Sequence, residues 1–500
     1  YIGWVGQRVL ADLRRDLYEH LQALPLGYYE RSRAGVLISR LTNDIDALQQ
    51  LVTDGVTSSV QSALSLVGAA AILVVLDWRL ALATLLVFPF MAAGTVAYRR
   101  ASTRAYRKLR ERLGLLTATL QEDLNGVRVV QGYAREERNF TRFREVNTSY
   151  RDANAETVLA NAAYFPAVEL LSALALAIVF GYGGWLYIHG HVTLGTLVAF
   201  VGYLSNFFDP VQALSQVYNT FLAASAALDK IVGVLDTEPD LVDAPDAVPL
   251  PPVAGAVAFE GVRFGYRADR PVIDRLDLDV AAGTTVALVG HTGAGKSTIV
   301  KLLARFYDPQ EGRVAIDGRD LRSVTQESLR RQLAIVPQEA FLFAGTVREN
   351  IAYGRPDADP AEVAAAAMAV GADAFITALP DGYETVIGER GARLSIGQRQ
   401  LLAFARALLA DPRILILDEA TSSVDIATEA RIEEALRRLL VGRTAFVVAH
   451  RLSTIRRADL IVVLEHGRVV EQGSHDDLIA LGGRYRSLYG DWLEAAAPVG

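Results

Sequence analysis

The sequence contains no cysteine among its 500 residues. Disulfide bonds, thiolate zinc sites and cysteine nucleophiles are therefore excluded. It also lacks a basic excess: 50 Lys and Arg stand against 57 Asp and Glu, and the formal net charge is −7. A nucleic-acid-binding surface is normally basic, so this balance does not favour one. The sequence begins at Tyr1 without a charged segment and short apolar run, and we interpret the start as a cut.

Apolar residues dominate what is present. They make up 51% of the sequence, charged residues make up only 21%, and the mean hydropathy of +0.22 is high for a water-soluble protein. No Asp, Glu, Lys or Arg occurs in residues 55–76, 80–98 or 170–208. A helix needs about 20 residues to cross a bilayer core, so these stretches have transmembrane length. Buried core helices, the alternative, are usually shorter and amphipathic.

We therefore predict four complete membrane helices, near residues 55–76, 80–98, 163–188 and 192–212. The last apolar stretch offers two places to turn, the glycines at 181–184 and the sequence HGH at 189–191. Arginines precede the first helix and open the long connection after residue 98. Because basic flanks stay in the cytoplasm, we expect the long connections and everything after about residue 229 to be cytoplasmic.

Two carboxylates, Glu169 and Asp209, border the last apolar stretch. Ionisable residues inside a membrane are functional candidates, and both could serve a substrate pathway. The alternatives are a position near a helix end for Glu169 and a kink at Pro210 facing a wet cavity for Asp209.

Residues 236–256 are rich in proline, aspartate and valine and have no helical period, which is typical of an extended linker. Residues 257–266 then alternate apolar and polar side chains, as an antiparallel strand does. Short β-rich runs and helical segments follow in alternation, the pattern of an α/β domain. We predict an all-α membrane domain over residues 1–235, a linker over 236–256 and an α/β nucleotide-binding domain over 257–493.

A glycine-rich loop lies between an apolar strand and a helical segment, in the sequence VALVGHTGAGKSTIV at 286–300. Gly290, Gly293 and Gly295 let successive backbone N–H groups face one anion, and the helix N-terminus adds its positive end. Lys296 would reach the β- and γ-phosphates, and Ser297 would hold Mg²⁺. The spacing predicts a phosphate-binding loop.

A second apolar strand, RILILDEATS at 413–422, ends in two acids. A carboxylate at the carboxyl end of a parallel strand faces a nucleotide crevice. Asp418 would then bind Mg²⁺ through water, and Glu419 would polarise the attacking water. An acidic pair alone is ambiguous, but it becomes informative downstream of a phosphate loop.

Three further motifs make the chain resemble the ABC transporters: LSIGQRQ at 394–400, SSVD at 422–425 and VVAHRLST at 447–454. The resemblance covers essentially the whole chain. The chain is similar to an exporter-type half-transporter, in which a membrane domain precedes one ATP-binding cassette. It implies that Tyr266 stacks on adenine, and that Gln338 contacts Mg²⁺ and the attacking water. It also implies that His450 contacts the γ-phosphate.

The other implied nucleotide contacts come from both cassettes of a dimer. Thr298 follows the phosphate loop of one cassette. Ser395, Gly397 and Gln398 would close on the γ-phosphate held by the partner, and Asp425 would connect the two sites. The resemblance also implies coupling helices near residues 24–35 and 125–136, which transmit cassette closure to the membrane helices.

The sequence departs from the family in two respects. Ile396 stands where glycine is commonest in the LSxGQ segment, and a β-branched side chain there would stiffen or crowd the turn. Family members usually have six membrane helices per half, whereas we find four and the tail of a second helix in residues 1–21.

We therefore expect an ATPase that uses ATP and Mg²⁺ to export a lipid, drug or peptide across a cell membrane. The expected partners are a second half-transporter, identical or different, and the bilayer. The composition hints at a bacterial source. The alternatives are an importer on the exporter scaffold, for example for siderophores, an ATP-gated membrane protein, and a soluble cassette ATPase of DNA repair.

Overall fold

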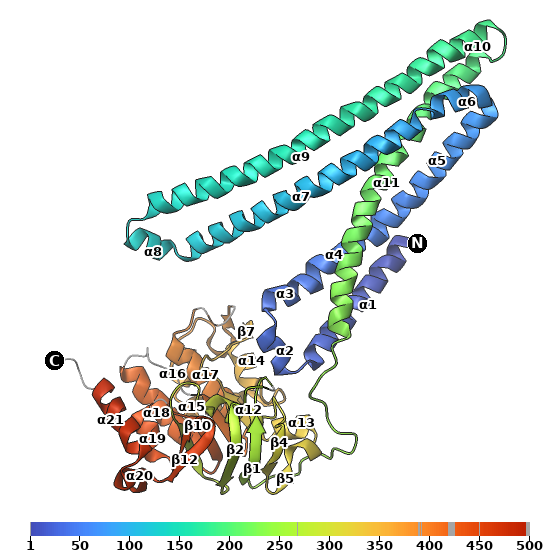
Figure 1. Ribbon diagram of the computed structural model, residues 1–500. Coiled ribbons are helices and arrows are strands. Elements are labelled where there is room, and N and C mark those ends of the chain that lie inside the picture. Colours follow the sequence, from blue (N-terminus) through green and yellow to red (C-terminus); the bar gives the residue numbers. More distant parts are fainter. Residues whose placement is uncertain are drawn as a thin grey trace. The chain divides into compact units, whose positions relative to one another are not determined.

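The computed structural model describes residues 2–267, 269–388, 391, 393–418, 426–449 and 451–496. They form two compact units (Figure 1). The helical unit consists of Tyr1–Leu21 and Gly35–Thr237, and the α/β unit consists of Gln22–Ala34 and Glu238–Gly500. A helical membrane domain followed by an α/β domain is the fold class that the sequence predicts, and this prediction is confirmed.

The helical unit is built almost entirely from long helices. Its elements are α1 (Ile2–Ala23), α3 (Ala34–Ser39), α4 (Ile45–Gln50), α5 (Val56–Leu76), α6 (Trp78–Leu85), α7 (Phe88–Asn125), α8 (Val127–Gly132), α9 (Glu136–Ile178), α10 (Gly184–Ile188) and α11 (Leu194–Leu235), with π-helical turns η1 (Arg40–Asp44), η2 (Leu51–Gly55) and η3 (Val179–Gly183).

Three continuous helical stretches in the described part of the chain are long and apolar enough to cross a membrane: Ala34–Leu76, Trp78–Asn125 and Glu136–Ile188. The first part of α11, Leu194–Leu204, is a shorter apolar stretch. Many of their apolar side chains are exposed; Val75 is 86% exposed and Leu170 is 71% exposed. Such a surface is unfavourable in water and fits hydrocarbon.

The chain turns where polar side chains cap the helices. Asp77 Oδ1 accepts a hydrogen bond from the Leu80 backbone N–H at 2.8 Å, which caps α6 after the first tight turn. Of the two possible turns in the last apolar stretch, the glycines at 181–184 are not used, because η3 continues there into α10. The chain reverses at residues 189–193, and Thr193 caps α11.

Helices α7 and α9 lie side by side, and α8 joins them at one end (Figure 1). The rings of Tyr98 and Tyr164 stack with centroids 4.1 Å apart, and Tyr98 Oη donates to Asn161 Oδ1 at 2.7 Å. Close to α8, Asn139 Nδ2 donates to Asp123 Oδ1 at 2.8 Å. Aromatic packing at one end and polar pairs at the other hold α7 and α9 together, with α8 at their tip.

Within its described residues, the α/β unit contains twelve strands: β1 (Val257–Phe264), β2 (Ile273–Val280), β3 (Thr285–Val289), β4 (Glu311–Ile316), β5 (Arg319–Asp320), β6 (Leu333–Val336), β7 (Gly345–Thr346), β8 (Val386–Ile387), β9 (Ile414–Asp418), β10 (Thr444–Val448), β11 (Leu460–Glu465) and β12 (Arg468–Gly473). Its helices are α2 (Leu26–Arg31), α12 (Lys296–Leu303), α13 (Gln326–Arg330), α14 (Val347–Ala352), α15 (Pro360–Ala369), α16 (Asp373–Thr377), α17 (Ile396–Leu409), α18 (Ile426–Leu440), α19 (Leu452–Arg457), α20 (His475–Leu481) and α21 (Arg484–Ala496).

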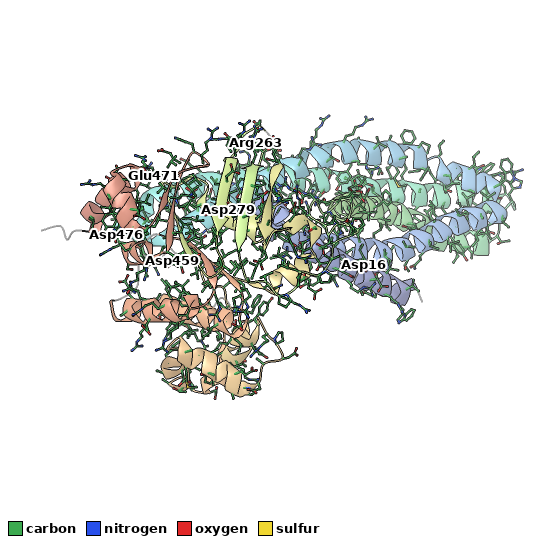
Figure 2. All side chains as sticks on the ribbon, turned by 90° about the horizontal axis from the view of Figure 1, so that it is seen from below. Asp16, Arg263, Asp279, Asp459, Glu471 and Asp476 are labelled. Carbon is green, nitrogen blue, oxygen red and sulfur yellow. The ribbon has the colours of Figure 1, made fainter. Side chains whose placement is uncertain are left out.

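Two main sheets form this unit. A four-stranded sheet has the order β2-β1-β4-β5, and its strand β1 alternates buried and exposed side chains as the sequence predicts. A six-stranded sheet has the order β12-β11-β3-β10-β9-β6, in which only β12 is antiparallel to its neighbour. Asp459, labelled in Figure 2, lies just before β11. Its Oδ2 accepts a hydrogen bond from the Thr285 backbone N–H at 2.8 Å, which holds the start of β3.

Candidate functional site

The phosphate loop lies between the end of the buried strand β3 and the start of α12. Its three glycines have positive φ angles: 148° at Gly290, 85° at Gly293 and 107° at Gly295. A Cβ on Gly290 would lie 2.4 Å from the backbone oxygen of Leu464, and one on Gly295 would lie 2.7 Å from Ile273 Cδ1. These positions therefore require glycine both for conformation and for space.

Lys296 is the first residue of α12, and only 7% of it is exposed. Its ammonium donates hydrogen bonds to the backbone oxygens of Gly290 at 2.7 Å and His291 at 3.0 Å. Burial lowers the pKa of Lys296, although the charge of Asp418 opposes this shift. The ammonium is thus held over the loop. A bound phosphate chain would replace the two backbone carbonyls as its hydrogen-bond acceptors.

The acidic strand end is brought to the same edge of the sheet. Within the parallel ladder, Val448 on β10 is paired with Leu288 on one side and with Asp418 on the other. Gln338 follows β6, whose Val336 is paired with Leu417. Since the strands are parallel, the segments after β3, β9 and β6 all leave the sheet at its carboxyl edge, the usual position of a nucleotide site.

The oxygen donors expected for Mg²⁺ fit that ion. They are the Ser297 hydroxyl, the Gln338 amide and the Asp418 carboxylate, and hard oxygen ligands are what Mg²⁺ prefers. Ser297 and Gln338 are exposed and Asp418 is half-buried. Among the described residues no cluster of three or more His, Asp or Glu could hold a metal by itself.

Tyr266, expected to stack on adenine, lies beside the start of α12. Its hydroxyl is 3.2 Å from Thr298 Oγ1, and 43% of the residue is exposed. The ring meets Phe264 and Tyr307 edge-on, with centroids 5.2 and 5.3 Å away. The contact between Tyr266 and Thr298 ties the expected base-binding ring to the helix that follows the phosphate loop.

The LSxGQ residues begin α17. Ser395 Oγ accepts a hydrogen bond from the Gln398 backbone at 3.2 Å, and Gln398 Oε1 accepts one from the Ser395 backbone at 2.8 Å. This reciprocal pair is a capping box. Gly397 is buried, whereas Ile396 is 47% exposed. The β-branched side chain therefore leaves the helix start intact and does not crowd it.

Three predicted site residues, Glu419, Asp425 and His450, lie outside the described residues. Glu419 follows Asp418 directly, and His450 comes two residues after Val448. Their roles stay predictions from the sequence, as do the contacts of all the other site residues with nucleotide.

Sequence reasoning missed a group around Tyr266. Glu30 of α2 pairs with Lys301 of α12 at 2.7 Å and accepts a hydrogen bond from Tyr307 Oη at 2.8 Å. The position of Lys301, five residues after Lys296, indicates its place on α12. No pattern in the sequence indicates that Glu30, over 270 positions away, is its partner.

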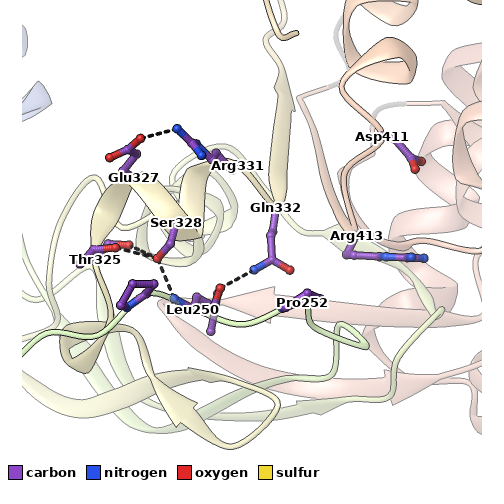
Figure 3. A pocket seen from close by; sticks show the side chains of 10 residues that line it. Leu250, Pro252, Thr325, Glu327, Ser328, Arg331, Gln332, Asp411 and Arg413 are labelled. Atoms are coloured by element: carbon purple, nitrogen blue, oxygen red, sulfur yellow. Dashed lines mark hydrogen bonds and ion pairs between the residues drawn. The ribbon is translucent and has the colours of Figure 1, made fainter.

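A cavity of about 560 Å³ lies elsewhere in this unit, at the amino ends of β6 and β9 (Figure 3). Its wall holds the linker: Ser328 Oγ accepts from the Leu250 backbone N–H at 2.8 Å, and Gln332 Nε2 donates to the Leu250 oxygen at 3.1 Å. Because the phosphate loop leaves the opposite edge of the sheet, this cavity is not the nucleotide site. Its side chains bind the backbone of the linker.

Comparison with known proteins agrees with this geometry. Residues 1–211 match the family described as ABC transporter transmembrane region, and residues 273–422 match the family described as ABC transporter. A solved structure of a bacterial Atm1-family ABC exporter with ATP bound superposes with a TM-score of 0.80 and 35% identity, over 99% of this chain and 86% of that one.

Two curated relatives have named activities. An ATP-dependent lipid A-core flippase of Syntrophus aciditrophicus is 41% identical over 488 residues, 98% of this chain and 81% of that protein. A multidrug efflux ATP-binding/permease protein of Mycobacterium tuberculosis is 40% identical over 497 residues, 99% of this chain and 42% of that protein. The membrane region excludes the alternative of a soluble DNA-repair ATPase. The chain belongs to the ABC transporters, with the membrane region of an exporter and an ATP-hydrolysing cassette on one polypeptide.

Proposed function

We propose that this exporter moves a hydrophobic or amphipathic molecule, a lipid, drug or peptide, across a bacterial cell membrane as part of a dimer. The observation that carries the proposal is the combination of long helices with lipid-compatible apolar surfaces and a complete phosphate loop in one chain. The names of the flippase and efflux relatives support this class of substrate.

Each cassette would bind ATP at the carboxyl edge of its six-stranded sheet. The loop glycines and the α12 N-terminus would bind the phosphates, and Lys296 would neutralise charge on the β- and γ-phosphates. Mg²⁺, held by Ser297 and Gln338 and through water by Asp418, would supply further charge neutralisation. Glu419 would polarise the attacking water, and His450 would hydrogen-bond the γ-phosphate.

A second half-transporter would complete each site. Ser395, Gly397 and Gln398 of one cassette would contact the γ-phosphate bound by the other, and Asp425 would connect the two sites. ATP would then favour the closed pair because it binds that state more tightly, and hydrolysis would remove the shared contact.

The tip helix α8 supports the proposal of a partner chain. Val129 of α8 is 63% exposed, and Tyr133, which directly follows α8, is 76% exposed. An apolar and aromatic tip on a charged arm fits a protein groove better than water. We propose that α8 is one coupling helix and that α2 is the other.

Transport into inverted membrane vesicles tests the function. We expect ATP-dependent accumulation of a fluorescent lipid or a hydrophobic dye, and loss of accumulation in the Glu419→Gln variant. Accumulation that is unchanged in Glu419→Gln would contradict pumping and favour an ATP-gated membrane protein. Accumulation only in right-side-out vesicles would favour an importer on the same scaffold.

A further inference from the structure

The segment Gln22–Ala34 belongs to the same compact unit as the cassette. It carries α2, whose Glu30 uses both carboxylate oxygens: Oε1 accepts from Lys301 Nζ at 2.7 Å and Oε2 accepts from Tyr307 Oη at 2.8 Å. Gly27 allows this close approach, because a Cβ there would lie 3.0 Å from Tyr307 Cε1. The segment is therefore held on the cassette by one carboxylate with two partners.

Both partners of Glu30 also contact Tyr266. The Lys301 ammonium lies over the Tyr266 ring, 5.3 Å from its centroid, a distance at which a cation is attracted by an aromatic face. The Tyr307 ring meets the Tyr266 ring edge-on with an interplanar angle of 86°. Two contacts of the expected adenine-stacking ring are thus made by side chains that Glu30 holds.

The charges of this group support a stable pair. Burial raises the pKa of Glu30, but the hydrogen bonds from Lys301 and Tyr307 outweigh it, so the pKa lies below its ordinary value. For Lys301, burial lowers the pKa, but the hydrogen bond to Glu30 and the proximity of Tyr266 raise it above its ordinary value. Both groups are therefore charged at neutral pH.

We propose that Glu30, Lys301 and Tyr307 are positioning residues that set the ring of Tyr266 and so connect binding of the nucleotide base to segment 22–34. This rests on the proposed role of Tyr266 in the nucleotide site. In this proposal the nucleotide base, and not only the phosphates, affects the contact between the cassette and segment 22–34. Stacking of a base on Tyr266 favours one ring orientation, and that orientation keeps Lys301 and Tyr307 where Glu30 binds them.

A purely structural role for Glu30, attachment of α2, makes a different prediction. Attachment alone would weaken coupling whichever nucleotide is bound. Positioning of Tyr266 requires that the effect depend on the base. Ligands with the same phosphates and sugar, with and without a base, therefore separate the two roles.

The experiment uses the purified protein in lipid nanodiscs and measures the inhibition constants of ADP and of ribose 5′-diphosphate against ATP hydrolysis. We expect Glu30→Gln and Lys301→Gln to raise the inhibition constant of ADP and the KM for ATP about three- to tenfold, the size of a lost cation–ring contact. The constant for ribose 5′-diphosphate and kcat should stay within about twofold. Lys301→Arg keeps a cation and should restore ADP binding.

The control is the exposed pair of Arg313 and Glu260, bidentate at 2.7 and 2.9 Å on the four-stranded sheet. Glu260→Gln should change neither constant. A second readout is amide hydrogen exchange of α2 at saturating ligand. ADP should slow it more than ribose 5′-diphosphate in the wild type, and Glu30→Gln should remove this difference.

Equal changes in the inhibition constants of ADP and ribose 5′-diphosphate would overturn this inference while wild-type transport remains normal. So would amide hydrogen exchange in α2 that is the same with both ligands in the wild type. Absence of ATP-driven transport in the wild type would instead overturn the proposed function. The two failures are thus distinguishable.

Discussion

Ser395 caps α17 and is also expected to contact the γ-phosphate bound by a partner cassette, and two substitutions separate these roles. Ser395→Ala removes the side-chain acceptor of the capping box, whose hydrogen bond from the Gln398 backbone is 3.2 Å long. Loss of a helix N-cap costs about 1 kcal/mol. For a domain of this size that lowers Tm by about 2–4 °C.

The expected loss of activity is larger. A hydrogen bond to a charged group contributes about 1.5–3 kcal/mol, so its loss in the transition state lowers the rate roughly 10- to 150-fold. Ser395→Asp keeps a good N-cap but adds negative charge where the γ-phosphate would bind. We expect Ser395→Asp to have a Tm near that of the wild type and to lose ATPase activity at least as strongly as Ser395→Ala.

Asp359 provides the matched control, because it caps α15 with the same reciprocal box to Glu362. Asp359→Ala should lower Tm about as much as Ser395→Ala and leave ATPase activity within about twofold. The assays are calorimetric unfolding and ATP hydrolysis in nanodiscs. Equal ATPase losses in Asp359→Ala and Ser395→Ala, or a fully active Ser395→Asp, would refute the assignment of Ser395 to the phosphate.

Three further predictions follow from the same geometry. Gly290→Ala must adopt a positive φ and displace the Leu464 oxygen, so it should destabilise the cassette by about 2 kcal/mol or more in denaturant unfolding, and an unchanged midpoint would contradict this. Ile396→Gly should change the ATPase rate by less than about threefold, because the side chain is 47% exposed and the cap is intact; a larger change would mean that Ile396 acts at the dimer interface. The pKa of Glu30 is lowered in the folded protein, so its carboxylate contributes stability that the Glu30→Gln variant lacks. The difference in unfolding free energy between the two proteins should be constant from about pH 5.5 to 9 and shrink as the pH falls through the folded pKa. A difference confined to alkaline pH would contradict the pairing with Lys301.

Local patterns in the sequence were sufficient for much of this protein. Uncharged stretches of membrane length indicate the spans, because lipid requires helices that satisfy their own backbone. The glycine and lysine spacing at 290–297 indicates a phosphate loop, because the positive φ angles there depend on residue type and not on distant contacts. Alternation along 257–264 indicates a half-buried strand, since successive strand side chains face opposite sides.

Only the tertiary structure decided which distant segments meet. Asp418 reaches the phosphate-loop edge because β10 pairs with both β3 and β9, and strand order is a property of the whole sheet. The turn at 189–193, in place of the nearby glycines, depends on how η3 packs against α11, since several backbone conformations are open to both segments. The pairing of Glu30 with Lys301 depends on docking of a short helix, and the chemistry of two charged residues does not specify their partners across the chain.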